Sequence, residues 1–235
     1  MTRTTNARIA GVTLLLYIAV GVAQMVLFGG ATAGEGIAAK LASIAQHVTD
    51  ARMVVLLGLL QCFSALVLGV TLYAITREQD PDLAMLGMIC RVAEGLGGIF
   101  MPETLGLLWL ATSTGADAPD TGAAHALGAF LLKMGAWSPS AIFFAVGSTL
   151  FSWLLLRGRM IPVALAWLGV VASVLLVVIL PLQLTGLFGA AVNWRGLVAW
   201  LVWLPMLVFE VVLALWLLIK GVAIPPNRQS PPAHA

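Results

Sequence analysis

Six apolar runs of about twenty residues or more constrain most what this chain can fold into. An apolar helix of about 20 residues crosses the roughly 30 Å hydrocarbon core of a bilayer. Because that core holds no water, backbone groups there must bond to each other, which an isolated segment achieves only as a helix. The runs cover about 9–28, 53–75, 84–111, 137–156, 161–183 and 197–219. The sequence therefore predicts an all-α fold, a polytopic transmembrane bundle of about six spanning helices.

Composition agrees with a chain that is solvated mainly by lipid. Only 9% of its 235 residues are charged and 61% are hydrophobic, whereas soluble domains carry roughly a quarter charged residues. The net charge of +2 is small and its basic residues are scattered, so the bilayer rather than nucleic acid is the expected partner. We predict one bundle domain over residues 1–224 and a disordered, Pro-rich tail over 225–235.

Two connections are long enough to contain short helices of their own. In the first, residues 29–52, apolar side chains recur at intervals of four, three and four: Ile37, Leu41, Ile44 and Val48. This spacing predicts an amphipathic helix that lies on the outer interface or caps the bundle. The second, residues 112–136, has a turn region followed by a predicted short helix over 123–134. Both are expected on the extracytoplasmic side.

The distribution of Lys and Arg predicts how the chain is oriented. If the N-terminal end is cytoplasmic, seven of these residues fall on the cytoplasmic side and four on the other. The seven are Arg3, Arg8, Arg77, Arg157, Arg159, Lys220 and Arg228; the four are Lys40, Arg52, Lys133 and Arg195. Because cytoplasmic loops carry an excess of basic residues, we expect both ends of the chain inside.

Four ionisable residues at membrane depth are the strongest functional signal. Arg91 and Glu94 lie one helical turn apart in the run 84–111, Glu103 follows in the same run, and Glu210 lies in the middle of the last run. A charge at the bilayer centre costs about 2.5–3.5 kcal/mol on insertion scales, so such residues usually face the protein interior or a pathway. Helical geometry lets Arg91, Glu94 and Glu210 share one level, whereas Glu103 projects elsewhere and nearer the outer end.

Other helices carry polar side chains on one stripe. They include Tyr17 and Gln24 in the first run and Gln61 and Ser64 in the second. The candidate ligand- or proton-binding residues are therefore Arg91, Glu94, Glu210, Gln61, Tyr17, Gln24, Ser64 and Glu103. The alternative is a satisfied polar network that only fixes helix packing, because structural networks perturb charges as functional ones do.

Motifs for catalysis, metals or cofactors are absent from the sequence. No histidine lies in a spanning run, which argues against a haem held between transmembrane histidines. His47, Asp50 and His125 would bind a metal only if two loops converged, so no metal is expected. Cys62 and Cys90 lie in apolar runs outside any Cys-x-x-Cys motif and read as small buried hydrophobes. We expect no cofactor and assign no catalytic residue.

Three segments together resemble the bacterial family of domain of unknown function 4386. They are Ala7-Arg8-Ile9-Ala10-Gly11, Arg91-Val92-Ala93-Glu94 and the closing stretch Phe209-Glu210-Val211-Val212-Leu213-Ala214-Leu215-Trp216-Leu217-Leu218-Ile219-Lys220-Gly221. Arg52 also looks like the family, whereas Glu103 after Pro102 departs from it. The resemblance covers nearly the whole chain and implies a small polytopic membrane protein of about six or seven helices. It implies no established activity, so no catalytic residue is carried over.

These observations favour a bacterial inner-membrane protein built around a polar pocket. Our leading hypothesis is the binding or transport of a small, partly apolar molecule, with proton linkage as an option. Arg91 would anchor an anionic or carbonyl group, and Glu94 or Glu210 would exchange the proton. The first alternative is a membrane-embedded enzyme that acts on a lipid with the same carboxylates. The second is a structural or regulatory membrane subunit without a ligand.

Overall fold

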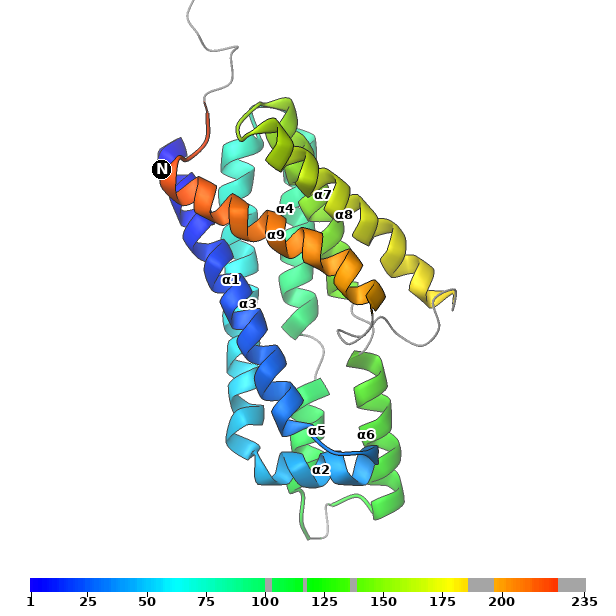
Figure 1. The fold of residues 1–235 in the computed structure, drawn as a ribbon. Helices are drawn as coiled ribbons and strands as arrows, with labels where there is room; N and C mark the ends of the chain where they lie inside the picture. The colour runs from blue at the N-terminus through cyan, green and yellow to red at the C-terminus, as the bar shows by residue number, and fades with distance from the viewer. Residues whose placement is uncertain (100–102, 116–117, 136–138, 186–196, 224–235) are drawn as a thin grey trace, which may run out of the picture. The chain divides into compact units, whose positions relative to one another are not determined.

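The chain is helical throughout the part that the structure describes. The computed structural model describes residues 1–99, 103–115, 118–135, 139–185 and 197–223. Within these ranges the helices are α1 (Arg3–Ala31), α2 (Gly36–Gln46), α3 (Val48–Thr76), α4 (Pro81–Ile99), α5 (Glu103–Thr112), α6 (Thr121–Gly135), α7 (Pro139–Arg157), α8 (Val163–Leu184) and α9 (Leu197–Ile219). Figure 1 traces them in chain order. The predicted all-α class is confirmed.

Five helices are long and apolar enough to cross a membrane: α1, α3, α7, α8 and α9. They correspond to five of the six apolar runs, and α9 coincides with the run 197–219. The remaining run, 84–111, contains α4 and α5, and residues 100–102 between these helices lie outside the description. α4 is not among the five long apolar helices because it contains three ionisable residues, Asp82, Arg91 and Glu94. The total of six spans stays a prediction.

The chain divides into two compact units, which we describe separately. Unit 1 contains residues 1–15, 66–92 and 142–235, and unit 2 contains residues 16–65 and 93–141. Each of α1, α3, α4 and α7 therefore contributes one part to each unit. The prediction of a single bundle domain is not tested by this division, and the predicted tail 225–235 lies outside the described residues.

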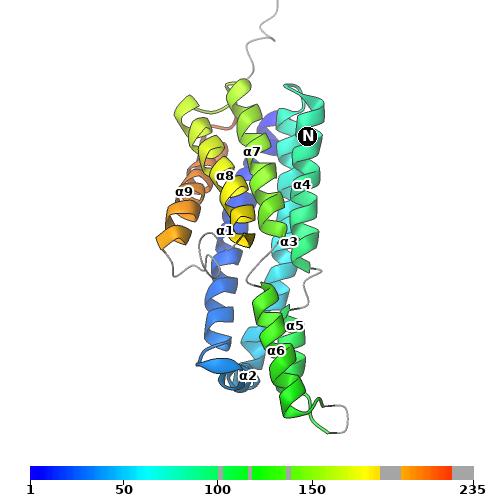
Figure 2. The ribbon, with the colours of Figure 1, turned by 90° about the vertical axis from the view of Figure 1, so that its right-hand side faces the viewer.

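Unit 1 is held together by close helix packing. In α8, a Cβ atom at Gly169 would lie 2.5 Å from the Phe209 ring of α9. In α1, a Cβ atom at Gly11 would lie 2.7 Å from the Ala214 carbonyl oxygen, also of α9. Glycine at these two positions lets the backbones approach, as is common between membrane helices. Figure 2 shows α7 and α8 side by side within this unit.

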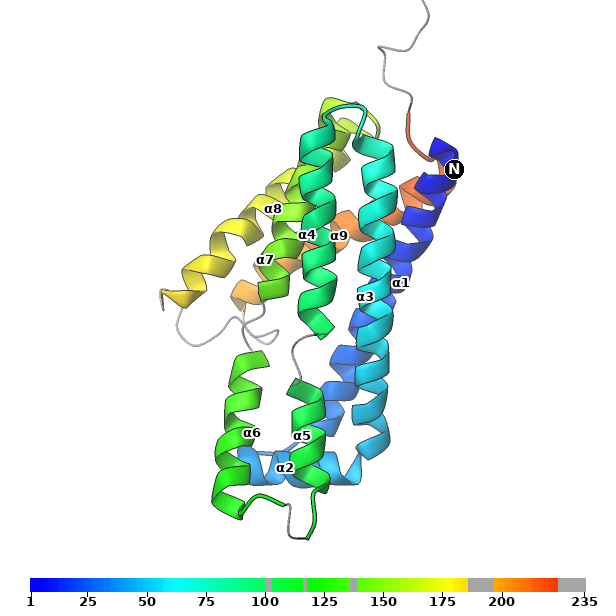
Figure 3. The same cartoon turned by 180° about the vertical axis from the view of Figure 1, so that it is seen from behind.

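Unit 2 contains the two predicted short helices. α2 buries Leu41 and Ile44 against Leu107 and Leu110 of α5. α6 packs against α5 and α2, and Figure 3 shows α2 crossing both. Asp120 is the N-cap of α6, because its carboxylate accepts a hydrogen bond of 2.9 Å from the Ala123 N–H. The helices are confirmed, and their extracytoplasmic position stays a prediction.

Candidate functional site

Unit 2 encloses a polar cavity with a volume of about 200 Å³. Its lining residues come from α1, α3, α4 and the first turn of α7. They are Tyr17, Gln24, Gly58, Gln61, Cys62, Ala65, Glu94, Gly95 and Ser140. We call this space the unit 2 cavity. Four of the predicted candidates, Tyr17, Gln24, Gln61 and Glu94, lie in it together.

Glu94 is the charged group of the unit 2 cavity. The residue is only 5% exposed, and its Oε1 accepts a hydrogen bond from the Tyr17 hydroxyl. Hydrogen bonds to an ionised carboxylate are stronger than those between neutral groups. Tyr17 therefore fixes the orientation of the Glu94 carboxylate in the wall.

The helices approach closely around the cavity because glycine replaces larger residues. A Cβ atom at Gly95 of α4 would lie 3.1 Å from the Cys62 carbonyl oxygen of α3. One at Gly97 would lie 2.6 Å from Ser140 Oγ of α7. Ser140 Oγ is buried and makes no hydrogen bond to any described residue, although a buried hydroxyl normally has a partner. The Oγ atom is too deeply buried to be offered to a molecule in the cavity, although other atoms of Ser140 line it.

Two predicted candidates line neither of the cavities found in the described residues. Ser64 is buried, but its hydroxyl donates a hydrogen bond of 2.8 Å to the Leu60 carbonyl oxygen in the same helix. Glu103 is the first residue of α5 and only partly buried. Their predicted roles as ligand- or proton-binding groups thus lack this geometric support.

Arg91 and Glu210 lie together in unit 1. They line a second cavity, of about 20 Å³, with Ser148 and Ser152 of α7 among its other walls. Arg91 is 2% exposed and Glu210 is 7% exposed. The Arg91 guanidinium carbon lies 5.1 Å from the centre of the Phe144 ring, a cation–π contact that suits a desolvated arginine. We call this space the unit 1 cavity.

Within each unit, the predicted candidates line one cavity. Glu94 lines the unit 2 cavity, and Arg91 and Glu210 line the unit 1 cavity; that all three share one pocket stays a prediction. Sequence reasoning missed Ser140 and Phe144. Ser140 had one weak signal, its position directly after Pro139 at the start of a helix, where serine is common.

The alternative metal site in the loops has no support from the structure. The described residues contain no group of three or more His, Cys, Asp or Glu side chains placed to hold a metal ion. His47 Nδ1 instead lies 2.9 Å from the Ser43 carbonyl oxygen, at the end of α2. That contact accounts for the ring position without a metal.

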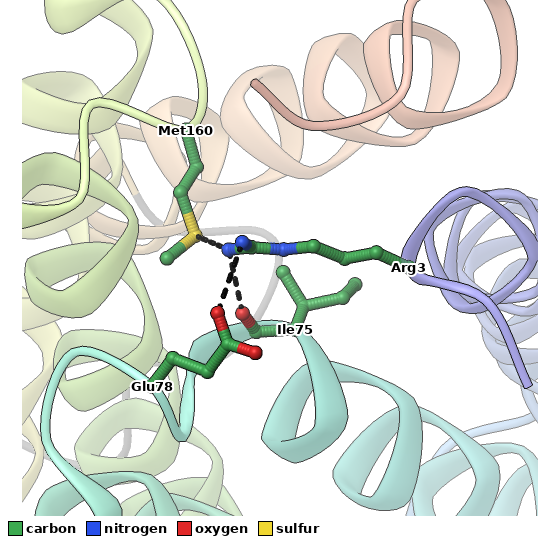
Figure 4. Close-up of polar contacts among 4 residues, drawn as sticks. All are labelled: Arg3, Ile75, Glu78 and Met160. Atoms are coloured by element: carbon green, nitrogen blue, oxygen red, sulfur yellow. Dashed lines mark hydrogen bonds and ion pairs between the residues drawn. The ribbon is translucent and has the colours of Figure 1, made fainter. Parts of the chain in front are cut away.

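A second polar group lies at one end of unit 1 (Figure 4). Arg3 donates to the Ile75 carbonyl oxygen at 2.9 Å and contacts the Glu78 carboxylate at 3.4 Å. Its Nη2 also lies 3.3 Å from Met160 Sδ. The Met160 carbonyl oxygen in turn accepts a hydrogen bond of 3.0 Å from the Ala223 N–H. These contacts join the beginning of α1, the end of α3, the α7–α8 turn and the residues after α9.

Comparison with known proteins bears on the family alone. The sequence model of a family described as Domain of unknown function (DUF4386) matches residues 9–221, which is most of the chain. The resemblance seen in the sequence motifs is thereby confirmed. No curated protein and no solved structure matches the chain.

Proposed function

Because the chain belongs to the DUF4386 family, whose description carries no activity, we propose its function from the site itself. The protein is a multi-pass protein of the bacterial inner membrane. It binds a small, partly apolar molecule in the unit 2 cavity and moves it across the membrane, with Glu94 exchanging a proton. The observation that carries this proposal is a cavity of about 200 Å³ lined by a buried carboxylate and four other polar side chains of unit 2.

The volume of the unit 2 cavity suits a small molecule. One water needs about 10–15 Å³ of such volume, so about 200 Å³ is far more than a single structural water occupies. Polar groups on the wall alternate with the apolar surfaces of Cys62 and Ala65. Ligand sites are typically apolar with a few placed polar groups. A partly apolar molecule therefore matches this wall.

The unit 1 cavity is too small for the same task. Its volume of about 20 Å³ has room for one or two waters. Arg91 and Glu210 are accordingly assigned to holding the helices of unit 1 rather than to anchoring the ligand.

The contacts of Arg3 support the six-span topology. Two connections can be in contact only if they lie on the same side of the membrane, so an even number of crossings must separate them along the chain. Between Glu78 and Met160, only α7 is among the five long apolar helices. Since Arg3 contacts both residues, a second crossing is needed, and the run 84–111 with α4 and α5 would supply it. The same end collects Arg3, Arg77, Arg157 and Arg159, as expected of the cytoplasmic side.

The proposal is tested by filling the cavity. We expect wild-type protein purified from its membrane and studied by native mass spectrometry to retain a bound small molecule. Gly58→Leu should lose it, because the glycine lines the cavity and its Cβ position contacts only Gln24 Nε2, at 3.2 Å. Gly30→Leu is the matched control, since its Cβ position has no neighbour within 4 Å. Equal retention by wild type and Gly58→Leu, or no bound molecule in the wild type, would overturn the proposal.

A further inference from the structure

The two glutamines of the unit 2 cavity each lie against a glycine of the other helix, and the same glycine–glutamine spacing occurs in both helices. α1 contains Gly21 and Gln24, and α3 contains Gly58 and Gln61, so each helix carries glycine three residues before glutamine. Gln24 Nε2 lies 3.2 Å from the Cβ position of Gly58. Gln61 Nε2 lies 3.3 Å from the Cβ position of Gly21. Each carboxamide thus lies over the glycine of the other helix, and both line the cavity.

Much of the hydrogen-bonding capacity of this pair is unused. A carboxamide has two N–H donors and an oxygen with two acceptor sites. Gln24 donates one N–H to the Val54 carbonyl oxygen at 3.0 Å. Gln61 makes no hydrogen bond with the rest of the described chain. The two carboxamides therefore present donors and acceptors that a bound molecule would satisfy.

These available groups are all uncharged. Among the residues that the structure describes, the lining contains no Lys or Arg and a single carboxylate, Glu94, which already accepts the Tyr17 hydroxyl. An anion would be repelled by that carboxylate and would find no basic side chain in the lining. An ion transferred from water into such a site also loses much of its hydration, whereas an uncharged polar group loses less. A neutral ligand that both donates and accepts fits two carboxamides best.

We infer that the unit 2 cavity selects an uncharged ligand with a carboxamide-like group, and that Gln24 and Gln61 determine this specificity. A carboxamide or urea carries an N–H donor beside a carbonyl acceptor, which is the pattern that a facing carboxamide recognises with two hydrogen bonds. The apolar remainder of the ligand lies against Cys62 and Ala65. This inference rests on the proposed binding function of the same cavity.

Three probes of similar shape separate the ligand classes: benzamide, benzoate and benzylammonium. The experiment follows the melting temperature Tm of the purified protein in detergent by tryptophan fluorescence. At ten times its Kd, benzamide should raise Tm by about 3 °C, since a ligand that binds only the folded state stabilises it. Benzoate and benzylammonium should leave Tm unchanged. Stabilisation by either ion without stabilisation by benzamide would overturn the inferred class.

Variants of Gln61 assign the specificity to the glutamine pair. Gln61→Leu loses no hydrogen bond to the described residues, so its Tm without ligand should stay near that of wild type. Its affinity for benzamide should fall about tenfold, the effect of one or two lost hydrogen bonds. Gln61→Glu should shift the preference to benzylammonium, which a purely structural role would not produce. Wild-type affinity for benzamide in Gln61→Leu would overturn the role of this residue.

The outcomes also separate this inference from the proposed function. If none of the probes stabilises the protein, but Gly58→Leu still loses the endogenous molecule, the ligand class is wrong and the binding function stands. If the probes fail and Gly58→Leu loses nothing, both fail together. Gly30→Ala should behave as wild type with every probe, because its Cβ position is open; a change there would mean that Tm reports effects outside the cavity.

Discussion

At the scale of single residues, the sharpest test concerns Arg91. Its side chain is almost fully buried, its guanidinium lies over the Phe144 ring, and its Cδ lies 3.5 Å from the Cβ position of Gly147. Arg91→Ala would remove these contacts and the positive charge from the cavity that it shares with Glu210. Loss of one member of a buried charged set costs about 3–5 kcal/mol, so we expect Tm to fall by roughly 10 °C.

Arg157 provides a matched control for this prediction. Its side chain is 48% exposed, and its Nη1 lies 3.7 Å from Asp80 Oδ2. Exposed ion pairs contribute about 0–1 kcal/mol, so Arg157→Ala should change Tm little. If thermal unfolding shows the two alanine variants to be equally stable, then Arg91 is not part of a buried network in the folded protein.

The second residue-scale prediction separates Glu94 from Glu210. Glu94→Gln keeps the side-chain shape and an oxygen that can accept the Tyr17 hydroxyl, but it removes the exchangeable proton. We therefore expect Tm to stay close to that of wild type while ligand binding loses its pH dependence between about pH 5 and 9. Glu210→Gln should keep that dependence, because Glu210 lines only the unit 1 cavity. Calorimetric titration across pH would detect this, and unchanged pH dependence in Glu94→Gln would exclude the proton role.

Most of the polar lining of the unit 2 cavity could be predicted from the sequence. Tyr17, Gln24, Gln61 and Glu94 stand out because polar groups in apolar helices are costly and therefore few. That they line one cavity depends on which helices approach one another, and the periodicity of a single helix does not contain that information. Ser140 was missed for the same reason, since its burial depends on the absence of a side chain at Gly97.

At the scale of helices, close packing between α8 and α9 should depend on Gly169. A methyl group there would lie 2.5 Å from the Phe209 ring and 2.6 Å from Ser152 Oγ. Overpacking of this kind costs about 1–3 kcal/mol, which outweighs the roughly 1 kcal/mol by which alanine favours a helix over glycine. Thermal unfolding of Gly169→Ala should show a lower Tm. Gly29→Ala in α1, where the Cβ position is open, should have a Tm equal to or above that of wild type. A Tm for Gly169→Ala above that of Gly29→Ala would contradict the packing between α8 and α9.

Helix positions were the most predictable feature of the chain. The run 197–219 coincides with α9, and the spacing of four, three and four located α2 except at its last member, because Val48 begins α3. α1 extends beyond the run 9–28 at both ends because backbone hydrogen bonding continues through polar residues such as Asn6, which is itself buried. The length of an apolar run therefore underestimates the length of the helix that contains it.

At the scale of the whole molecule, the number of spans decides on which side the connection between α5 and α6 lies. With six spans and the N-terminal end inside, Glu35 and Asp120 are both outside, and Gln79 is inside. If the run 84–111 does not cross, Asp120 is inside with Gln79, and Met160 is then outside, away from Arg3. The contact of 3.3 Å between Arg3 Nη2 and Met160 Sδ is incompatible with that second arrangement. We therefore expect Asp120 to be accessible from the extracytoplasmic side.

Cysteine labelling in intact cells measures this directly. The native Cys62 and Cys90 are buried, and replacing both with alanine gives a background for the single variants Glu35→Cys, Gln79→Cys and Asp120→Cys. Glu35 and Asp120 are exposed in the fold, so a membrane-impermeant maleimide should label both from outside. It should label Gln79→Cys only after the membrane is opened. If Asp120→Cys is labelled only after the membrane is opened, like Gln79→Cys, six spans are rejected. An odd number of crossings would then separate Asp120 from Glu35.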